Sequence, residues 1–237
     1  DCRYLARSDR PTTVAFVKLV NGQATYAFYD EGTAGRMLST DQLPVLGPEV
    51  STLFLGGISL VNDPAAATYE ALQAREAGTR VTMLDPNIRP GFIAGKEAAY
   101  RARIERMIAR ADLVKLSDED LHWLEGPGDI GALARGILAR GPKAVFVTEG
   151  AKGARAVTAT EDRFVTAAPV TVADTVGAGD TFNAGVLAAL HGAGALTKAR
   201  VAALAAAELD AALTLGTRAA AVTVSRAGAN PPWAHEL

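Results

Sequence analysis

Short apolar runs alternate with longer amphipathic stretches along most of the chain. The runs have the length of buried strands, and the stretches repeat apolar residues at helical spacing, as from Tyr100 to Ile108. Strands separated by helices predict a parallel sheet with right-handed crossovers, covered by helices on both faces. The predicted strands are 52–55, 80–84, 113–116, 144–148 and 221–224, and the predicted helices are 63–78, 97–111, 118–124, 130–139 and 197–215.

Two hairpins are predicted outside this alternation. Residues 12–20 and 24–29 are rich in β-forming residues and are joined by Asn21-Gly22, a dipeptide that suits a tight hairpin turn. Residues 154–157 and 163–165 predict an antiparallel pair at the edge of the main sheet. The fold class is therefore α/β, a doubly wound and mostly parallel sheet with a small separate β unit.

Composition narrows the range of functions. A chain of 237 residues with a net charge of −2 and no basic run carries no electrostatic signature of nucleic-acid or acidic-membrane binding. Its single cysteine excludes an internal disulfide framework, and it has neither a Walker lysine motif nor a Ser-His-Asp order. We expect a cytoplasmic protein that acts on small molecules, without nucleic-acid or membrane partners.

The stretch from Asp174 to Asn183 reads D-T-V-G-A-G-D-T-F-N and carries the most specific chemistry. Gly177, Ala178 and Gly179 allow a close backbone approach and lead into a helix whose first N–H groups lack intrahelical partners, which makes an anion cradle. Asp180 in the same turn could simply complement the helix dipole. A carboxylate beside bound phosphate instead suits a base that takes a proton from an attacking hydroxyl, so the stretch indicates phosphoryl transfer.

These ten residues resemble the C-terminal signature of the PfkB, or ribokinase-like, carbohydrate kinases. The resemblance covers essentially the whole chain and is strongest to fructokinase-like members. It implies that Asp180 is the base, that the amides of residues 177–179 form the anion hole, and that the first hairpin is a lid over the sugar. ATP and Mg²⁺ would be used, and a monovalent cation such as K⁺ near Asp174 is a family expectation.

A second motif, D-P-N-I-R from Asp85 to Arg89, follows a predicted strand at the end where open α/β sheets bind ligands. It could be a plain turn with a surface arginine. It also matches the D-P-N-x-R motif of fructokinase-like and 2-keto-3-deoxygluconate-kinase-like members. By that resemblance Arg89 and Asn87 contact the sugar or the phosphoryl group, and Phe28 of the lid contacts the sugar. Acid-sugar kinases of the family tend to have arginine where this chain has Asp30, which disfavours an anionic sugar.

The remaining candidates would contact the nucleotide or its metal. K-L-S-D-E-D stands where family members commonly place N-x-x-E, so Ser117 and Asp120 replace that pair. Asp120 suits a hydrated cation, and it equally suits plain complementation of a helix dipole. T-E-G-A-K-G at 148–153 resembles a nucleotide-contacting turn, although a hairpin needs glycine anyway. The resulting nucleotide set is Lys115, Ser117, Thr148, Gly150, Gly153 and Ser225, with Asp120 as the metal candidate.

The sequence thus predicts an ATP-dependent sugar kinase, with fructose as the substrate. A 2-keto-3-deoxygluconate kinase and a catalytically silent sugar or nucleotide sensor are the alternatives. Residues 1–44 would form the lid and its return segment, and residues 45–237 the kinase core. Family members normally begin with a strand and helix that carry a sugar-binding Asp and a Gly-Gly pair, and neither precedes Pro11, so an N-terminal part is expected to be absent. Exposed aromatics on the lid favour a homodimer through it.

Overall fold

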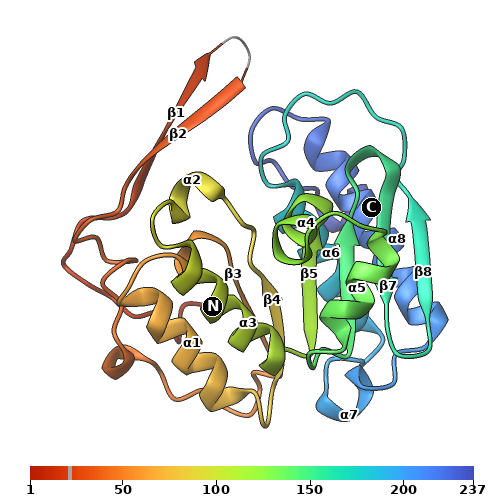
Figure 1. Cartoon of the computed structure of the whole chain (residues 1–237), viewed down its shortest axis with the longest axis horizontal. Coiled ribbons are helices and arrows are strands. Elements are labelled where there is room, and N and C mark those ends of the chain that lie inside the picture. The colour runs from red at the N-terminus through yellow and green to blue at the C-terminus, as the bar shows by residue number, and fades with distance from the viewer. Residues whose placement is uncertain (21–22) are drawn as a thin grey trace.

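The computed structural model describes the backbone of residues 1–20 and 23–237, and the side chains of residues 1–16 and 28–237. The predicted Asn21-Gly22 turn lies outside the described residues. On either side of it, β1 (Val14–Val20) and β2 (Gln23–Tyr29) pair antiparallel and form a sheet of their own. This hairpin projects away from the rest of the molecule, above α2 (Figure 1).

The main sheet has six strands in sequential order, β3-β4-β5-β6-β7-β8. The first four are parallel, and the last three pair antiparallel with one another. Every predicted strand of this sheet up to residue 165 is therefore confirmed. Their bounds are β3 Thr52–Gly56, β4 Val81–Asp85, β5 Leu113–Ser117, β6 Ala144–Thr148, β7 Gly153–Val157 and β8 Asp162–Thr166.

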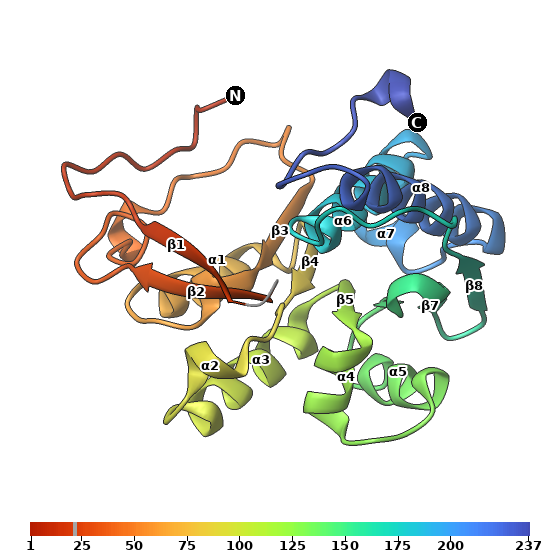
Figure 2. The same cartoon turned by 90° about the horizontal axis from the view of Figure 1, so that it is seen from above.

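Helices cover both faces of the sheet, as the doubly wound pattern predicts (Figure 2). Residues of β4, β5, β6 and β7 enter two different apolar clusters, because successive strand side chains point to opposite faces. One cluster packs against α3, α4 and α5, and the other packs against α6 and α8. The helices are α1 Ala65–Glu76, α2 Pro90–Ile93, α3 Glu97–Arg110, α4 Asp118–Glu125, α5 Ile130–Leu138, α6 Ala178–Gly192, α7 Lys198–Val201 and α8 Ala206–Val224.

The C-terminal part of the pattern was predicted wrongly in two respects. The expected helix 197–215 is two helices, α7 and α8, and the expected strand 221–224 is the last turn of α8. Gly216 resembles a helix stop in the sequence, but here it lies inside α8, where a Cβ would stand 2.9 Å from Cδ2 of Phe182. The glycine allows close packing of α8 on α6, so the helix continues through it.

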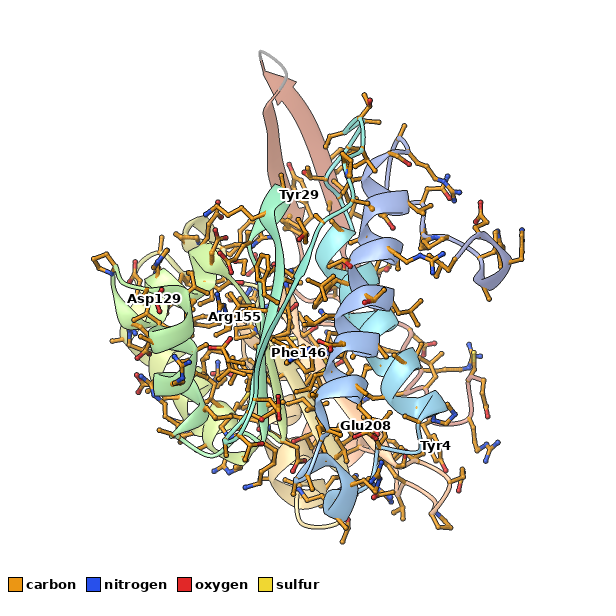
Figure 3. All side chains as sticks on the ribbon, turned by 90° about the vertical axis from the view of Figure 1, so that its right-hand side faces the viewer. Tyr4, Tyr29, Asp129, Phe146, Arg155 and Glu208 are labelled. Carbon is orange, nitrogen blue, oxygen red and sulfur yellow. The ribbon has the colours of Figure 1, made fainter. Side chains whose placement is uncertain are left out.

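The view from the side shows the layers directly (Figure 3). Phe146 of β6 is fully buried between the sheet and the α6–α8 layer, whereas Asp129 caps α5 in the opposite layer. Within the described residues no helix combines the length and the apolar character needed to cross a bilayer. The division into a lid at 1–44 and a core at 45–237 stays a prediction.

Candidate active site

The two principal motifs come together at the carboxyl edge of the parallel strands. Asp85 is the last residue of β4, and Asn183 lies in the second turn of α6. Nδ2 of Asn183 donates to Oδ2 of Asp85 at 2.7 Å, and both side chains are buried. This bond joins the start of the D-P-N-I-R loop to the helix that carries Asp180.

Asp85 is the polar centre of this junction. Its Oδ2 also lies 3.2 Å from Nζ of Lys115, and its Oδ1 accepts the N–H of Asn87 at 3.1 Å. Burial raises the pKa of the Asp85 carboxyl, while the charge of Lys115 and the Asn183 bond act in the opposite direction. The carboxylate is thus held from three sides and is only 3% exposed.

The D-P-N-I-R loop is fixed by further bonds to the core. The hydroxyl of Tyr100 donates to the Pro86 carbonyl at 3.2 Å, and the N–H of Ile88 donates to Oδ1 of Asp120 at 2.8 Å. Asn87 has a φ of +46°, which few residues adopt. Arg89 is exposed at the start of α2, and Nη1 of its guanidinium donates to the neighbouring Ile88 carbonyl at 3.0 Å. The loop therefore holds Arg89 at a fixed point on the surface.

The bend before α6 has the form of an anion cradle. Gly177 is its N-cap, at a φ of +79° in the left-handed region that favours glycine. The N–H of Ala178 donates to the Thr175 carbonyl at 3.3 Å. Among described residues no acceptor contacts the N–H of Gly177, Gly179 or Asp180. The N–H groups of these three residues are therefore free to bind an anion, and the predicted anion hole of Gly177, Ala178 and Gly179 stays a prediction.

Contacts to the C-terminal loop hold this bend in place. The carboxylate of Asp174 accepts the N–H groups of Val176 and Gly228, each at 3.0 Å, and these bonds lower its pKa. A Cβ on Gly177 would stand 3.2 Å from Cβ of Ala229. Ser225, the C-cap of α8, is exposed beside the same segment. The bend and the predicted nucleotide residue Ser225 thus lie on neighbouring loops.

Asp180 is exposed at the first turn of α6 and does not point into the core. That exposure allows a substrate hydroxyl to approach its carboxylate. Chemically, the bend offers three amide donors and one carboxylate within four consecutive residues, which is the combination that proton abstraction beside a bound phosphate requires.

Lys115 is a buried residue near the end of β5. Its side chain is 5% exposed and its ammonium pairs with Asp85, and its nucleotide contact stays a prediction. A Cβ on Gly179 would stand 3.2 Å from Nζ of Lys115. The ammonium therefore lies beneath the first turn of α6.

The other nucleotide candidates have local structural roles in the structure. Oγ of Ser117 accepts the N–H of Asp120 at 3.0 Å and caps α4, and Thr148 donates to the Leu116 carbonyl at 3.5 Å. A Cβ on Gly153 would stand 2.1 Å from the carbonyl oxygen of Val165, so the hairpin itself requires this glycine. Gly150 has a φ of +56° in the same turn. Their nucleotide contacts stay predictions.

Asp120 is buried and uses both carboxylate oxygens on backbone groups. One accepts the N–H of Ile88 and the other accepts the N–H of Ser117 at 3.0 Å. This arrangement favours capping of α4 over direct metal contact. Across the described side chains no three His, Cys, Asp or Glu residues gather into a metal-binding group.

A hollow lies at the base of the hairpin. Phe28 of β2 and Phe92 of α2 meet edge to face, with ring centroids 4.8 Å apart, and both line a cavity of about 350 Å³. A second cavity of about 170 Å³ shares Asp30, Ile58 and Asn62 with it. Residues 177–180 line neither cavity. Phe28 thus lines the larger cavity, and its contact with a sugar stays a prediction.

A chain of polar contacts in this hollow was missed from the sequence. Asp30 accepts from Arg36 at 3.1 Å and from Nδ2 of Asn62 at 2.8 Å, and Lys96 donates to Oδ1 of Asn62. These residues come from segments that the sequence separates widely. Of these residues only Asp30 carried a signal in the sequence, because acid-sugar kinases of the resembled family tend to have arginine at its position.

Known proteins share both the sequence and the fold. The family described as "pfkB family carbohydrate kinase" matches residues 1–236. A fructokinase of Rhizobium leguminosarum bv. trifolii is 57% identical over 199 residues, which are 84% of this chain and 61% of that protein. The chain thus spans less than two thirds of the length of this relative.

Solved structures give the same result. A fructokinase from Vibrio cholerae O395, in a form bound to fructose, ADP and calcium ion, matches with a TM-score of 0.78 and 26% identity over 94% of this chain and 70% of its own. A double mutant of that fructokinase, bound to fructose, ADP and potassium ion, matches with a TM-score of 0.77 and 25% identity over 91% and 68%.

Proposed function

Because the chain belongs to the pfkB family of carbohydrate kinases, we propose that it transfers the γ-phosphoryl group of ATP to a hydroxyl of a small sugar, and that this sugar is fructose. The observation that carries the proposal is the turn at Gly177–Asp180, where free amides and an exposed carboxylate share one helix start. The bond from Asn183 to Asp85 sets this turn beside the D-P-N-I-R loop.

Each part of the turn has a defined task in this reaction. Asp180 takes the proton of the attacking hydroxyl, which makes that oxygen a better nucleophile. The amides of Gly177, Gly179 and Asp180, with Ala178 completing the turn, hold the charge that develops on the transferred group. Arg89, placed by Asn87 and its loop, binds the sugar or the phosphoryl group through its planar guanidinium.

In this proposal Mg²⁺ binds together with the nucleotide. Mg²⁺ neutralises charge on the nucleotide phosphates when it is bound. The described residues offer no three-ligand site, so phosphate oxygens and water would hold it, with Asp120 at most an indirect partner. A fructokinase structure bound to potassium ion supports the use of a K⁺ ion, which we place beside Asp174 in this proposal.

The hollow beneath the hairpin is the proposed sugar site. Its larger part, about 350 Å³, is within the usual range of small-ligand pockets. Asp30 lines it where acid-sugar kinases of the resembled family tend to have arginine, and this favours fructose over 2-keto-3-deoxygluconate. In this proposal residues 1–44 are the lid and 45–237 the core, the nucleotide lies along Thr148, Gly150, Gly153 and Ser225, and the protein works in the cytoplasm.

A second copy of the chain is the proposed partner of the lid. Val14, Phe16 and Tyr29 share one face of the hairpin, and Phe16 and Tyr29 are 60% and 64% exposed. Their rings meet edge to face, with centroids 5.5 Å apart. Such an aromatic face is typical of an interface between identical subunits.

Release of ADP from ATP in the presence of fructose, 2-keto-3-deoxygluconate, ribose or adenosine tests the function. We expect turnover with fructose. Turnover confined to 2-keto-3-deoxygluconate would move the assignment to that kinase. Thermal stabilisation by sugar or nucleotide without ADP release would identify a sensor instead.

A further inference from the structure

A buried lysine stands in an apolar row of the sheet. Lys115 shares its face of β5 with Leu113, and Met83 and Phe146 of the flanking strands join Leu113 in the apolar cluster beneath α6 and α8. Burying an ammonium costs free energy, even when it is paired. Replacing the whole Lys115–Asp85 pair by uncharged side chains of similar volume is often neutral or stabilising, although removing one partner alone is not. Stability therefore does not account for the presence of the pair.

The ammonium lies where charge affects the anion cradle. Its Nζ is within van der Waals contact of the position that a Cβ of Gly179 would take, at 3.2 Å. On the other side it meets Oδ2 of Asp85, also at 3.2 Å. The resulting dipole has its positive end at the first turn of α6, so it adds to the positive potential that the free amides create.

The cluster is also incompletely hydrogen-bonded. Asn183 is 1% exposed, its Nδ2 donates to Asp85, and its Oδ1 has no donor among the described residues. Buried polar atoms without partners are rare and often mark sites kept for function. Two independent features, the buried ammonium and the unpartnered amide oxygen, thus converge under the same turn.

Asp85 connects this cluster to the second motif. Its Oδ2 engages Asn183 and Lys115, while its Oδ1 accepts the N–H of Asn87. One carboxylate therefore fixes the loop of Arg89 relative to the turn of Asp180. A substitution in the Lys115–Asp85 pair would therefore affect both the loop of Arg89 and the turn of Asp180.

We propose that Lys115 is a positioning residue for phosphoryl transfer: paired with Asp85, it fixes the first turn of α6 and places positive charge beneath the amides that receive the transferred group. This inference rests on the proposed kinase function. The charge acts through the amides of the turn, since Lys115 is buried beneath them and its ammonium pairs with Asp85. Its effect is therefore largest where negative charge develops, in the transition state.

Two variants separate charge from packing. Lys115→Met removes the ammonium at similar volume, and the double variant Asp85→Asn with Lys115→Met removes both charges, so that neither is left unpaired. Lys198→Met is the matched control, because Lys198 pairs with buried Asp112 at 2.6 Å at the opposite end of β5. Thermal unfolding, kcat, KM for ATP and sugar, and the affinity for ADP are measured for all three.

We expect kcat of Lys115→Met to fall by about 10- to 100-fold. This fall is no larger than the fall in kcat caused by removing one direct oxyanion-hole donor, which is about 10²–10³-fold. ADP affinity should change by less than about twofold, because ADP lacks the transferred group. The double variant should recover thermal stability and keep the low kcat. Lys198→Met should lose stability and keep kcat.

Recovery of kcat in the double variant would show that the Lys115–Asp85 pair has only a structural role, and this would overturn the inference. An unchanged kcat in Lys115→Met would overturn it as well. A wild-type chain that turns over none of the sugars would overturn the proposed function instead. In that case the ratio of ATP to ADP affinity decides the inference. A ratio that Lys115→Met leaves unchanged would contradict it, and a fall of several-fold would support it.

Discussion

The N–H of Asn87 donates to Oδ1 of Asp85 at 3.1 Å, across a turn in which Asn87 takes a φ of +46°. The aspartate closes the turn with its own side chain, and asparagine is among the few side-chain-bearing residues that accept this backbone. The direction of the D-P-N-I-R loop, and with it the place of Arg89, depends on this pair.

Replacing Asn87 by valine should strain the loop. A β-branched residue in the left-handed region costs about 1–2 kcal/mol, and we expect that loss in the free energy of unfolding in urea together with a higher KM for the sugar. Asn87→Gly is the control for the backbone, because glycine tolerates this φ. Equal stability of the valine and glycine variants would show that the turn is not strained.

Replacing Asp180 by asparagine should remove turnover and leave nucleotide binding. Loss of a general base lowers kcat by about 10²–10⁴-fold, while the amides of the turn stay in place to bind phosphate. Calorimetry measures the affinity for ADP, and a coupled assay measures kcat. Asp129→Asn removes the same charge from the N-cap of α5 and should change neither. Turnover retained in Asp180→Asn would place the base elsewhere.

Replacing Asp120 by asparagine distinguishes capping from metal binding. The amide nitrogen of asparagine cannot accept the N–H of Ser117, so about 1–3 kcal/mol of the free energy of unfolding should be lost. The Mg²⁺ concentration for half-maximal activity should stay the same. Ser117→Ala deletes the bond in which Ser117 accepts the N–H of Asp120. It should lose a similar free energy of unfolding and leave the Mg²⁺ requirement unchanged, as Asp120→Asn does. A large rise in the Mg²⁺ requirement confined to Asp120→Asn would instead support a metal role.

Replacing Gly185 by alanine should destabilise the α6–α8 contact. The added Cβ would stand 2.7 Å from Cα of Gly216, and overpacking of this kind costs about 1–3 kcal/mol. Gly192 at the end of the same helix has open space around it, so Gly192→Ala should stabilise the protein by up to about 1 kcal/mol. Urea unfolding of both variants gives the comparison, and a neutral Gly185→Ala would mean that the helices separate easily.

Replacing Phe92 by alanine should weaken sugar binding alone. Phe92 lines the proposed sugar site and supports Phe28 through an edge-to-face contact worth about 0.5–1.5 kcal/mol. If the site depends on that support, the sugar KM should rise by about two- to tenfold with little change in KM for ATP. Phe164→Ala on β8, half-exposed and away from the hollow, should leave both values unchanged. A rise in KM for ATP of the same size would indicate that the hairpin does not form the sugar site.

The sheet could be predicted because its strands are short apolar runs bounded by polar or turn residues, as at Ala144–Thr148. The helix that contains Gly216 was divided wrongly for a physical reason: a glycine that ends a helix and a glycine that lets two helices approach look alike in one sequence. Only the contact with Phe182 separates the two cases.

The site shows the same limit. The D-P-N-I-R loop and the bend at Gly177 could be found because each is continuous in the chain. The contacts of Asn62 with Asp30 and Lys96 join residues 32 and 34 positions apart, which no local pattern reveals. The burial of Lys115 was within reach, since it alternates with Leu113 on one face of a strand.

The partners in the Asn183–Asp85 bond are 98 positions apart, with β5 to β8 between them. Closing so long a loop is slow relative to forming helices and hairpins. During refolding, recovery of activity should therefore lag behind the far-ultraviolet circular dichroism signal. Activity would then appear only after most of the secondary structure has formed.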